Sequence, residues 1–141
     1  MSQLPDFTTI RDTFALLGDW EEKYAFLIDI GRMLPPYPED MRDEAHKVPG
    51  CTSQVWMAHR WDGDTLHMDV DSDAHLVKGL LAVLMAMYND KPAAEIIALS
   101  ADPAPVFAEL GLEGNLSPNR RNGFFAVASR VRQLAGANLQ G

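Results

Sequence analysis

The sequence is poor in cysteine, because its 141 residues include only Cys51. A single thiol cannot form an internal disulfide, and it supplies too few ligands for a structural zinc ion or an iron–sulfur cluster. Two interpretations remain, an inert buried thiol and a reactive displayed one. Free cysteines are among the most often buried residues, so residue type alone leaves both interpretations open.

Two further absences limit the class of protein. The longest apolar run lies between Gly79 and Tyr88, too short to span a bilayer, and the N-terminus lacks the pattern of an export signal. Twelve basic residues against 20 acidic ones give a net charge of −8. We therefore expect no membrane and no nucleic-acid partner, a cytoplasmic location, and a protein partner with a basic surface. The one basic cluster is interpreted as a solvated helix face and comprises Arg120, Arg121, Arg130 and Arg132.

Hydrophobic residues make up 47% of the chain, enough for one core in a single domain over residues 1–141. A first helix is predicted over Thr8–Leu17. A second follows the N-cap Asp19 and ends by Leu34, where a proline cluster begins. Four later helices are predicted from the capping residues Asp71-Ser72-Asp73 to about Tyr88, over Ala93–Leu99, from Asp102-Pro103 to Gly111, and over Asn119–Ala137.

Between these helices the pattern predicts a hairpin. Strands are expected over Val55–Trp61 and Thr65–Asp71, joined by a turn at Asp62-Gly63-Asp64. Apolar and polar residues alternate in the second strand, so one of its faces is buried. The pattern does not fix the register, nor which face of the first strand joins the core. The predicted fold class is α+β, a small antiparallel sheet (a hairpin of about residues 55–71) packed by helices on one face.

Cys51 lies at the junction between a polar loop, residues 35–50, and the first predicted strand. Pro49 and Gly50 interrupt regular structure directly before the sulfur. Functional residues concentrate in loops of this kind, which favours the displayed, reactive thiol.

The segment Gly50-Cys51-Thr52-Ser53-Gln54-Val55-Trp56 resembles the active-site loop of the SufE family, sulfur-acceptor proteins that work with cysteine desulfurases in iron–sulfur cluster assembly. Three more blocks occur in the family's order and at similar spacing. They are Trp20-Glu21-Glu22-Lys23-Tyr24 with Leu34-Pro35, Asp71-Ser72-Asp73-Ala74 with Val77-Lys78-Gly79-Leu80, and Leu116-Ser117-Pro118-Asn119-Arg120 with Asn122-Gly123. Four blocks in register make the resemblance specific. Thr52 departs from it, since the family usually has glutamine beside the sulfur.

The resemblance implies the SufE/IscU-like α+β fold and makes Cys51 the persulfide acceptor. It implies that the sulfur comes from a pyridoxal-phosphate-dependent cysteine desulfurase, SufS-like or CsdA-like, whose turnover the acceptor stimulates. A downstream iron–sulfur scaffold then receives the sulfur. We expect no cofactor and no metal on the chain itself. The resemblance does not separate SufE proper from its paralogue CsdE, which serves a different desulfurase.

The remaining site residues are predicted to support the loop or contact the partner, and they are Gly50, Ser53, Gln54, Asp73 and Arg120. Ser53 and Gln54 are expected to fix the loop by hydrogen bonds. Asp73 is most simply the N-cap of the next helix, with a partner contact as the second interpretation. Arg120 either orients the loop or contacts the partner, and plain surface charge is an equal alternative.

Nearby residues carry weaker expectations. His46 and Lys47 are close enough in sequence to favour a thiolate, with surface charge as the alternative. Trp56 is expected in the core. His59 and His67 lie on adjacent predicted strands and would face each other in one register, although two histidines alone do not make a metal site.

Two other functions are compatible with a lone cysteine. A thiol hydrolase would use Cys51 with a histidine base and would turn over an ester or amide without a partner. No histidine falls in a family block, which argues against it. A non-catalytic interaction module would use Cys51 only structurally. Under the leading hypothesis the Cys51 loop is partly sheltered in the free protein and moves on docking, because thiolates and persulfides oxidise readily.

Overall fold

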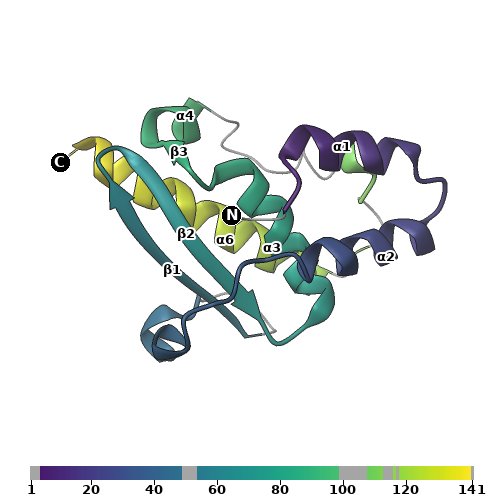
Figure 1. The fold of residues 1–141 in the computed structure, drawn as a ribbon, viewed down its shortest axis with the longest axis horizontal. Coiled ribbons are helices and arrows are strands. Elements are labelled where there is room, and N and C mark those ends of the chain that lie inside the picture. The colour runs from purple at the N-terminus through teal and green to yellow at the C-terminus, as the bar shows by residue number, and fades with distance from the viewer. Residues whose placement is uncertain (1–3, 49–53, 99–107, 113–115, 117, 141) are drawn as a thin grey trace.

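The computed structural model describes residues 4–48, 54–98, 108–112, 116 and 118–140. Two N-terminal helices precede a small antiparallel sheet, and further helices follow it (Figure 1). The N-terminal elements are α1 (Phe7–Leu16), α2 (Trp20–Gly31) and two short 3₁₀ turns, η1 (Glu39–Met41) and η2 (Glu44–His46). The remaining elements are β1 (Val55–Asp62), β2 (Thr65–Ser72), α3 (His75–Tyr88), β3 (Lys91–Pro92), α4 (Ala93–Ala98) and α6 (Pro118–Gln140).

Aspartates start both N-terminal helices. The Asp6 carboxylate accepts a hydrogen bond from the Thr9 amide at 2.8 Å, and Asp19 accepts one from the Glu22 amide at 2.9 Å. A side-chain oxygen at the N-cap satisfies one of the amides that lack a partner in the first turn. The predicted cap at Asp19 is therefore confirmed, and α2 ends at Gly31, ahead of Pro35.

The predicted hairpin is confirmed, and the structure supplies its register. Asp62 pairs with Thr65 across a two-residue turn whose first residue, Gly63, has φ of +61°. A left-handed φ at this position is the geometry of a type II′ turn, which favours glycine. A third strand, β3, pairs with the start of β2 and contains Pro92. The sequence analysis did not predict it, because two residues that include a proline carry no strand pattern.

The register places His59 and His67 on opposite faces of the sheet. His59 is paired with Met68, whereas His67 is paired with Arg60. Directly paired residues point to the same face, and neighbours along a strand point to opposite faces. The expectation that the two histidines could face each other is therefore wrong.

One face of the sheet joins the main core. Val55 and Met57 of β1 lie on the same face as Leu66, Met68 and Val70 of β2, and all five are buried. α3 is the central helix behind this face, since it contacts α2, β2 and α6 (Figure 1). The arrangement is the predicted α+β fold, with helices on one face of an antiparallel sheet.

Two glycines let α2 and α3 approach each other closely. A Cβ added at Gly79 would lie 2.3 Å from the carbonyl oxygen of Leu27, and one added at Gly31 would lie 2.8 Å from the Gly79 amide nitrogen. Neither backbone group can move without shifting a helix. Glycine is therefore required at this helix crossing for steric reasons.

The opposite face of the sheet carries a second, smaller apolar cluster made of Tyr37, Trp56 and Ala58. Trp56 is 7% exposed, so its expected burial is confirmed, but it lies outside the main core. The segment that follows α2 lies over this face and brings Tyr37 onto it (Figure 1).

The start of α3 differs from the prediction. Its N-cap residue is Ala74, whose side chain makes no capping bond, and the Ala74 amide donates to the Ser72 hydroxyl instead at 3.2 Å. The Asp73 carboxylate is bonded elsewhere, as described below, so the N-cap expectation for Asp73 is wrong. A tertiary partner outcompetes the local amides for this carboxylate.

The later helices follow the expected order. α4 and α6 match their predicted segments, and α6 continues three residues beyond Ala137. The helix predicted between Asp102 and Gly111 falls mostly outside the described residues. No helix in the described segments combines the length and apolar character needed to cross a membrane.

Candidate functional site

The structure defines both ends of the segment that contains Cys51. Cys51, Gly50 and Ser53 themselves lie outside the described residues. On the incoming side, the Val48 amide donates to the Val55 carbonyl at 2.9 Å, and Lys47 forms a β-bridge with Trp56. The chain that leaves Val48 therefore returns to a position hydrogen-bonded to it. Val48 and Val55 are therefore held next to each other at the edge of β1, on either side of the segment that contains Cys51.

The outgoing end of this segment is fixed by Gln54 and Asp73. The Gln54 backbone amide donates to Asp73 Oδ1 at 3.1 Å, and its side-chain amide donates to Oδ2 at 3.1 Å. The Asp73 amide in turn donates to the Gln54 carbonyl at 3.4 Å. Both carboxylate oxygens thus hold a residue three positions from Cys51. The structure joins two residues that the sequence analysis singled out separately.

Arg42 holds the incoming segment, residues 35–48, on the outer face of the sheet. This is the face that carries Tyr37, Trp56 and Ala58. The Arg42 guanidinium lies 5.3 Å from the ring centre of Tyr37 and 5.0 Å from that of Trp56. It also pairs with Asp71 on β2, at 2.5 Å, and with Glu39, at 3.1 Å. Cation–π contacts and a half-buried ion pair act together here. One side chain therefore links the segment before Cys51 to both strands.

Burial in this cluster alters tyrosine ionisation. The pKa of Tyr37 is raised to about 12, first by desolvation and then by the nearby negative charge of Asp43, against a smaller opposing effect of Arg42. The Tyr37 hydroxyl donates to the Met41 carbonyl at 3.0 Å. Tyr37 therefore remains a neutral hydrogen-bond donor throughout the physiological pH range.

The two cations predicted beside the thiol each hold a carboxylate of their own 3₁₀ turn. His46 Nδ1 lies 2.7 Å from Asp43 Oδ1, and Lys47 Nζ lies 2.8 Å from Glu44 Oε1. Hydrogen bonds from His46 lower the pKa of Asp43. The turn η2 is thus internally ion-paired directly before the Cys51 segment. That His46 and Lys47 favour the thiolate form of Cys51 stays a prediction.

Arg120, the last of the predicted site residues, lies in the first turn of α6, which begins at Pro118. The structure describes its backbone but not its side chain, so the prediction that it orients the loop or contacts a partner stays open.

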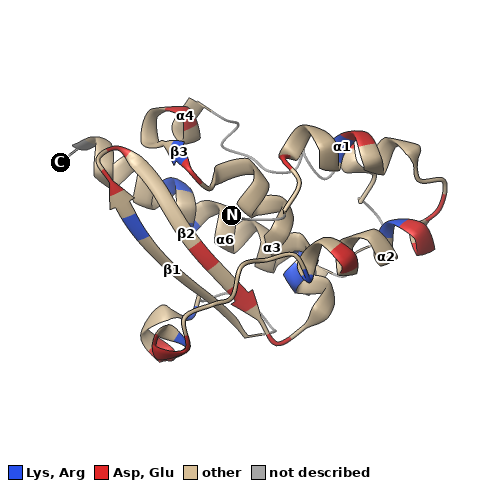
Figure 2. Cartoon of the chain, viewed as in Figure 1, with Lys and Arg blue, Asp and Glu red and all other residues tan. Residues whose placement is uncertain are grey.

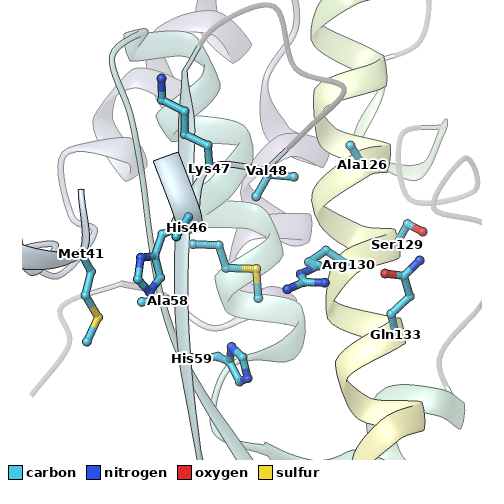
Figure 3. A pocket seen from close by; sticks show the side chains of 12 residues that line it. Met41, His46, Lys47, Val48, Ala58, His59, Ala126, Ser129, Arg130 and Gln133 are labelled. Atoms are coloured by element: carbon cyan, nitrogen blue, oxygen red, sulfur yellow. The ribbon is translucent and has the colours of Figure 1, made fainter. Parts of the chain in front are cut away.

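A groove of about 620 Å³ begins at the base of the Cys51 segment. It runs between η2, the edge of β1 and α6, and Figure 3 shows Arg130 of α6 and His59 of β1 pointing into the same space. Its lining comprises Met41, Ala45, His46, Lys47, Val48, Met57, Ala58, His59, Ala126, Ser129, Arg130 and Gln133. In the part of the chain that the structure describes, no group of three or more acidic, histidine or cysteine side chains could hold a metal ion.

Sequence analysis missed Arg42 and the groove. Arg42 belongs to a polar loop with no periodic pattern, and its partner Asp71 is 29 positions away. Only the hairpin register, which the pattern left open, would have placed Trp56 and Asp71 on the face that Arg42 covers. The groove combines residues from three distant segments, and no local signal joins them.

Comparison with known proteins now identifies the family. The profile described as "SufE: Fe-S metabolism associated domain" matches residues 8–135. The chain belongs to the SufE family. An uncharacterized SufE-like protein of Rhizobium etli is 42% identical to this SufE-family chain over 130 residues, which cover 89% of this chain and 86% of that protein. The sulfur acceptor protein CsdE of Escherichia coli is 39% identical over 124 residues, 87% and 83% of the two chains.

A solved structure shares the fold. The solution structure of a hypothetical protein from Thermus thermophilus superimposes with a TM-score of 0.75 and covers 96% of each chain, at 18% identity. At this level of sequence identity, the similarity shows the fold alone. The SufE-family resemblance carried by four sequence blocks is therefore confirmed, together with its α+β architecture.

Proposed function

We propose that this SufE-family chain is a sulfur-acceptor protein in which Cys51 takes persulfide sulfur from a pyridoxal-phosphate-dependent cysteine desulfurase. In this role it stimulates the desulfurase and delivers the sulfur for iron–sulfur cluster assembly. The observation that carries the proposal is the SufE match over residues 8–135, which contains the only cysteine of the chain. The relative named as a sulfur acceptor protein, 39% identical, supports it.

The chemistry is a thiol exchange. The Cys51 thiolate attacks the terminal sulfur of the donor's persulfide, R–S–SH, and forms a new S–S bond. The donor's S–S bond breaks, the donor leaves as the thiolate R–S⁻, and the proton stays on the transferred sulfur, now Cys51–S–SH. Atoms and electrons balance without an oxidant or a second cysteine. This matches a chain that has only one cysteine.

The geometry at the two ends of the loop supports this role. The Val48–Val55 hydrogen bond and the Gln54–Asp73 contacts hold the ends of the Cys51 segment against the sheet. A rigid base positions a short loop toward a partner's active site while the loop itself can rearrange on docking. Gly50 and Ser53 belong to this loop, and we assign them to its conformation rather than to the reaction.

The test is intact-protein mass spectrometry after incubation with a cysteine desulfurase and free cysteine. We expect a reductant-sensitive mass gain of one sulfur atom in the parent protein and none in Cys51→Ser. Desulfurase turnover should rise with the parent and not with the variant. A mass gain that persists in Cys51→Ser would contradict the assignment of Cys51.

The same assay separates the partner types. A SufS-like and a CsdA-like desulfurase are compared side by side, because a CsdE-type acceptor serves a different desulfurase from SufE proper. The absence of a sulfur gain with both active desulfurases would contradict the proposed function. Hydrolysis of an ester or amide by the chain alone would instead favour a cysteine hydrolase.

A further inference from the structure

The strand β1 is an edge of the sheet with part of its backbone unpaired. The strand order is β1-β2-β3, and beyond Trp56 no strand in the described segments pairs with the outer side of β1. The Val55 carbonyl accepts from Val48, so it points away from β2. Since alternate residues of a strand direct their backbone groups to the same side, His59 and Trp61, which lie beyond the Lys47–Trp56 bridge, also direct theirs outward. Among the described residues, no strand pairs with this part of the edge.

The groove described above lies along this edge. Met57 and His59 line it from β1, and α6 lines its other side with Ser129, Arg130 and Gln133 (Figure 3). Exposed strand edges are templates for a further strand, and proteins usually cover or block them. At the other side of the sheet, the short β3 with Pro92 does so. The β1 edge carries no such device among the described residues.

The charge of the groove is opposite to that of the chain. None of its twelve lining residues is acidic, although the chain has 20 acidic residues. α6 contains four arginines and no carboxylate in 23 residues, and the acidic residues coloured in Figure 2 lie on other parts of the chain. His46 and Lys47 at the rim are paired within η2, but Arg130 has no ion-pair partner in the residues that the structure describes.

The pKa of His59 also indicates that the groove is positively charged. Burial lowers its pKa first, and the charges of Arg130 and His46 lower it further. The positive charge of Arg130 on α6 therefore acts on the β1 edge at His59. An incoming carboxylate there would be attracted, whereas a cation would be repelled.

We infer that this groove is a docking site for an extended, acidic segment of a partner protein, which adds to the free edge of β1 as a fourth strand beside Arg130. The backbone of the segment would pair with His59 and Trp61. Alternate side chains of an added strand point to the same face, so carboxylates at every second position can face α6. The inference goes beyond sulfur transfer, because no step at Cys51 requires this groove.

The experiment uses the full-length protein and fluorescent probe peptides of about seven residues, enough to cover the free edge. One peptide alternates threonine and glutamate, a second alternates threonine and lysine, and a third keeps the glutamates but has proline between them. We expect binding of the first only. Amide hydrogen exchange measured in the same complex should slow at His59 and Trp61.

Variants locate the site. Arg130→Gln should weaken the acidic peptide by about tenfold, the effect of one lost charge contact at an interface. Arg60→Gln is the matched control, since Arg60 is an exposed arginine of β1 on the opposite face, and it should change binding by no more than about twofold. Cys51→Ser should bind as well as the parent, which keeps this test separate from that of sulfur transfer.

Several results would overturn the inference. One is the absence of binding at about 1 mM peptide, the weak limit of a specific contact. Equal binding of the proline peptide, or of free glutamate, would show a carboxylate site without strand addition. Self-association that protects the same two amides would assign the edge to a second copy of the chain.

Discussion

The two faces of the sheet are stabilised in different ways. The face toward the helices joins one continuous apolar core, which extends from Ile10 on α1 to Ala135 on α6. The outer face carries a small apolar cluster of Tyr37, Trp56 and Ala58, and Arg42 contacts its two rings and forms an ion pair with Asp71. The first face depends on close packing, whereas the second depends on one polar side chain.

This difference separates the stability of the fold from the positioning of the loop. Apolar burial over a large core supplies most of the free energy of folding. The outer cluster adds little apolar area, but it fixes residues 35–48, which lead to Cys51. Substitutions on the helix face should therefore unfold the protein, and substitutions on the outer face should alter sulfur acceptance in a folded protein.

The largest effect is expected at the α2–α3 crossing. Gly79→Ala places a methyl carbon 2.3 Å from the Leu27 carbonyl oxygen, closer than van der Waals contact allows. Such overpacking should lower the free energy of unfolding by about 3 kcal/mol, measured by urea denaturation. Gly136→Ala in α6 is the control, because its Cβ meets no atom within 4 Å. The control should stabilise the helix by about 0.5–1 kcal/mol. Equal effects of both variants would contradict the packing account.

The second effect concerns the outer face. Arg42→Met removes the cation and the Asp71 pair while keeping much of the side-chain volume. We expect a folded protein whose rate of sulfur acceptance at Cys51 falls on the order of tenfold, because misplacing a reacting group by a fraction of an ångström is costly. Rapid-quench mass spectrometry with a desulfurase measures the rate. Arg60→Met, on the same face but exposed, serves as the control. Equal rates in both variants would show that Arg42 does not position the Cys51 segment.

A third prediction isolates the outgoing anchor. Asp73→Ala should lower the free energy of unfolding by less than about 1 kcal/mol, since its hydrogen bonds to Gln54 are exposed. It should raise the alkylation rate of Cys51 in the free protein. Gln54→Ala should act in the same direction, and the double variant should add little to either single change. Additive effects in the double variant would show that the two residues act independently.

The smallest effect is a dependence of stability on alkaline pH. The pKa of Tyr37 is about 12 in the folded protein, against an ordinary value of 10. The folded state therefore holds this proton more tightly, and the stability it contributes is complete below about pH 10 and declines as pH rises toward about 12. Burial raises the pKa of Tyr88 as well, so Tyr37→Phe should reduce the slope but not abolish it. An unchanged slope in urea titrations of Tyr37→Phe would contradict this assignment.

Local sequence signals predicted the elements well and the contacts between them less well. Capping at Asp19 and the turn at Gly63 depend on atoms a few residues apart, so a pattern within one segment suffices. The role of Asp73 was misjudged because an aspartate before a helix is usually its cap. Here Gln54, 19 positions away, donates two hydrogen bonds to the carboxylate and accepts one from the Asp73 amide. Arg42 could not be predicted either, because its partners meet only once the register is set.

The hydrogen bond between Val48 and Val55 has a consequence for how this family can vary. It closes the cysteine segment at its base, so the sheet does not depend on what lies between the two residues. The entropy of closing a loop grows only slowly with its length. Insertions between Val48 and Gln54 should therefore cost the fold little. We expect the segment that contains Cys51 to tolerate changes of length and sequence while the framework beneath it stays the same.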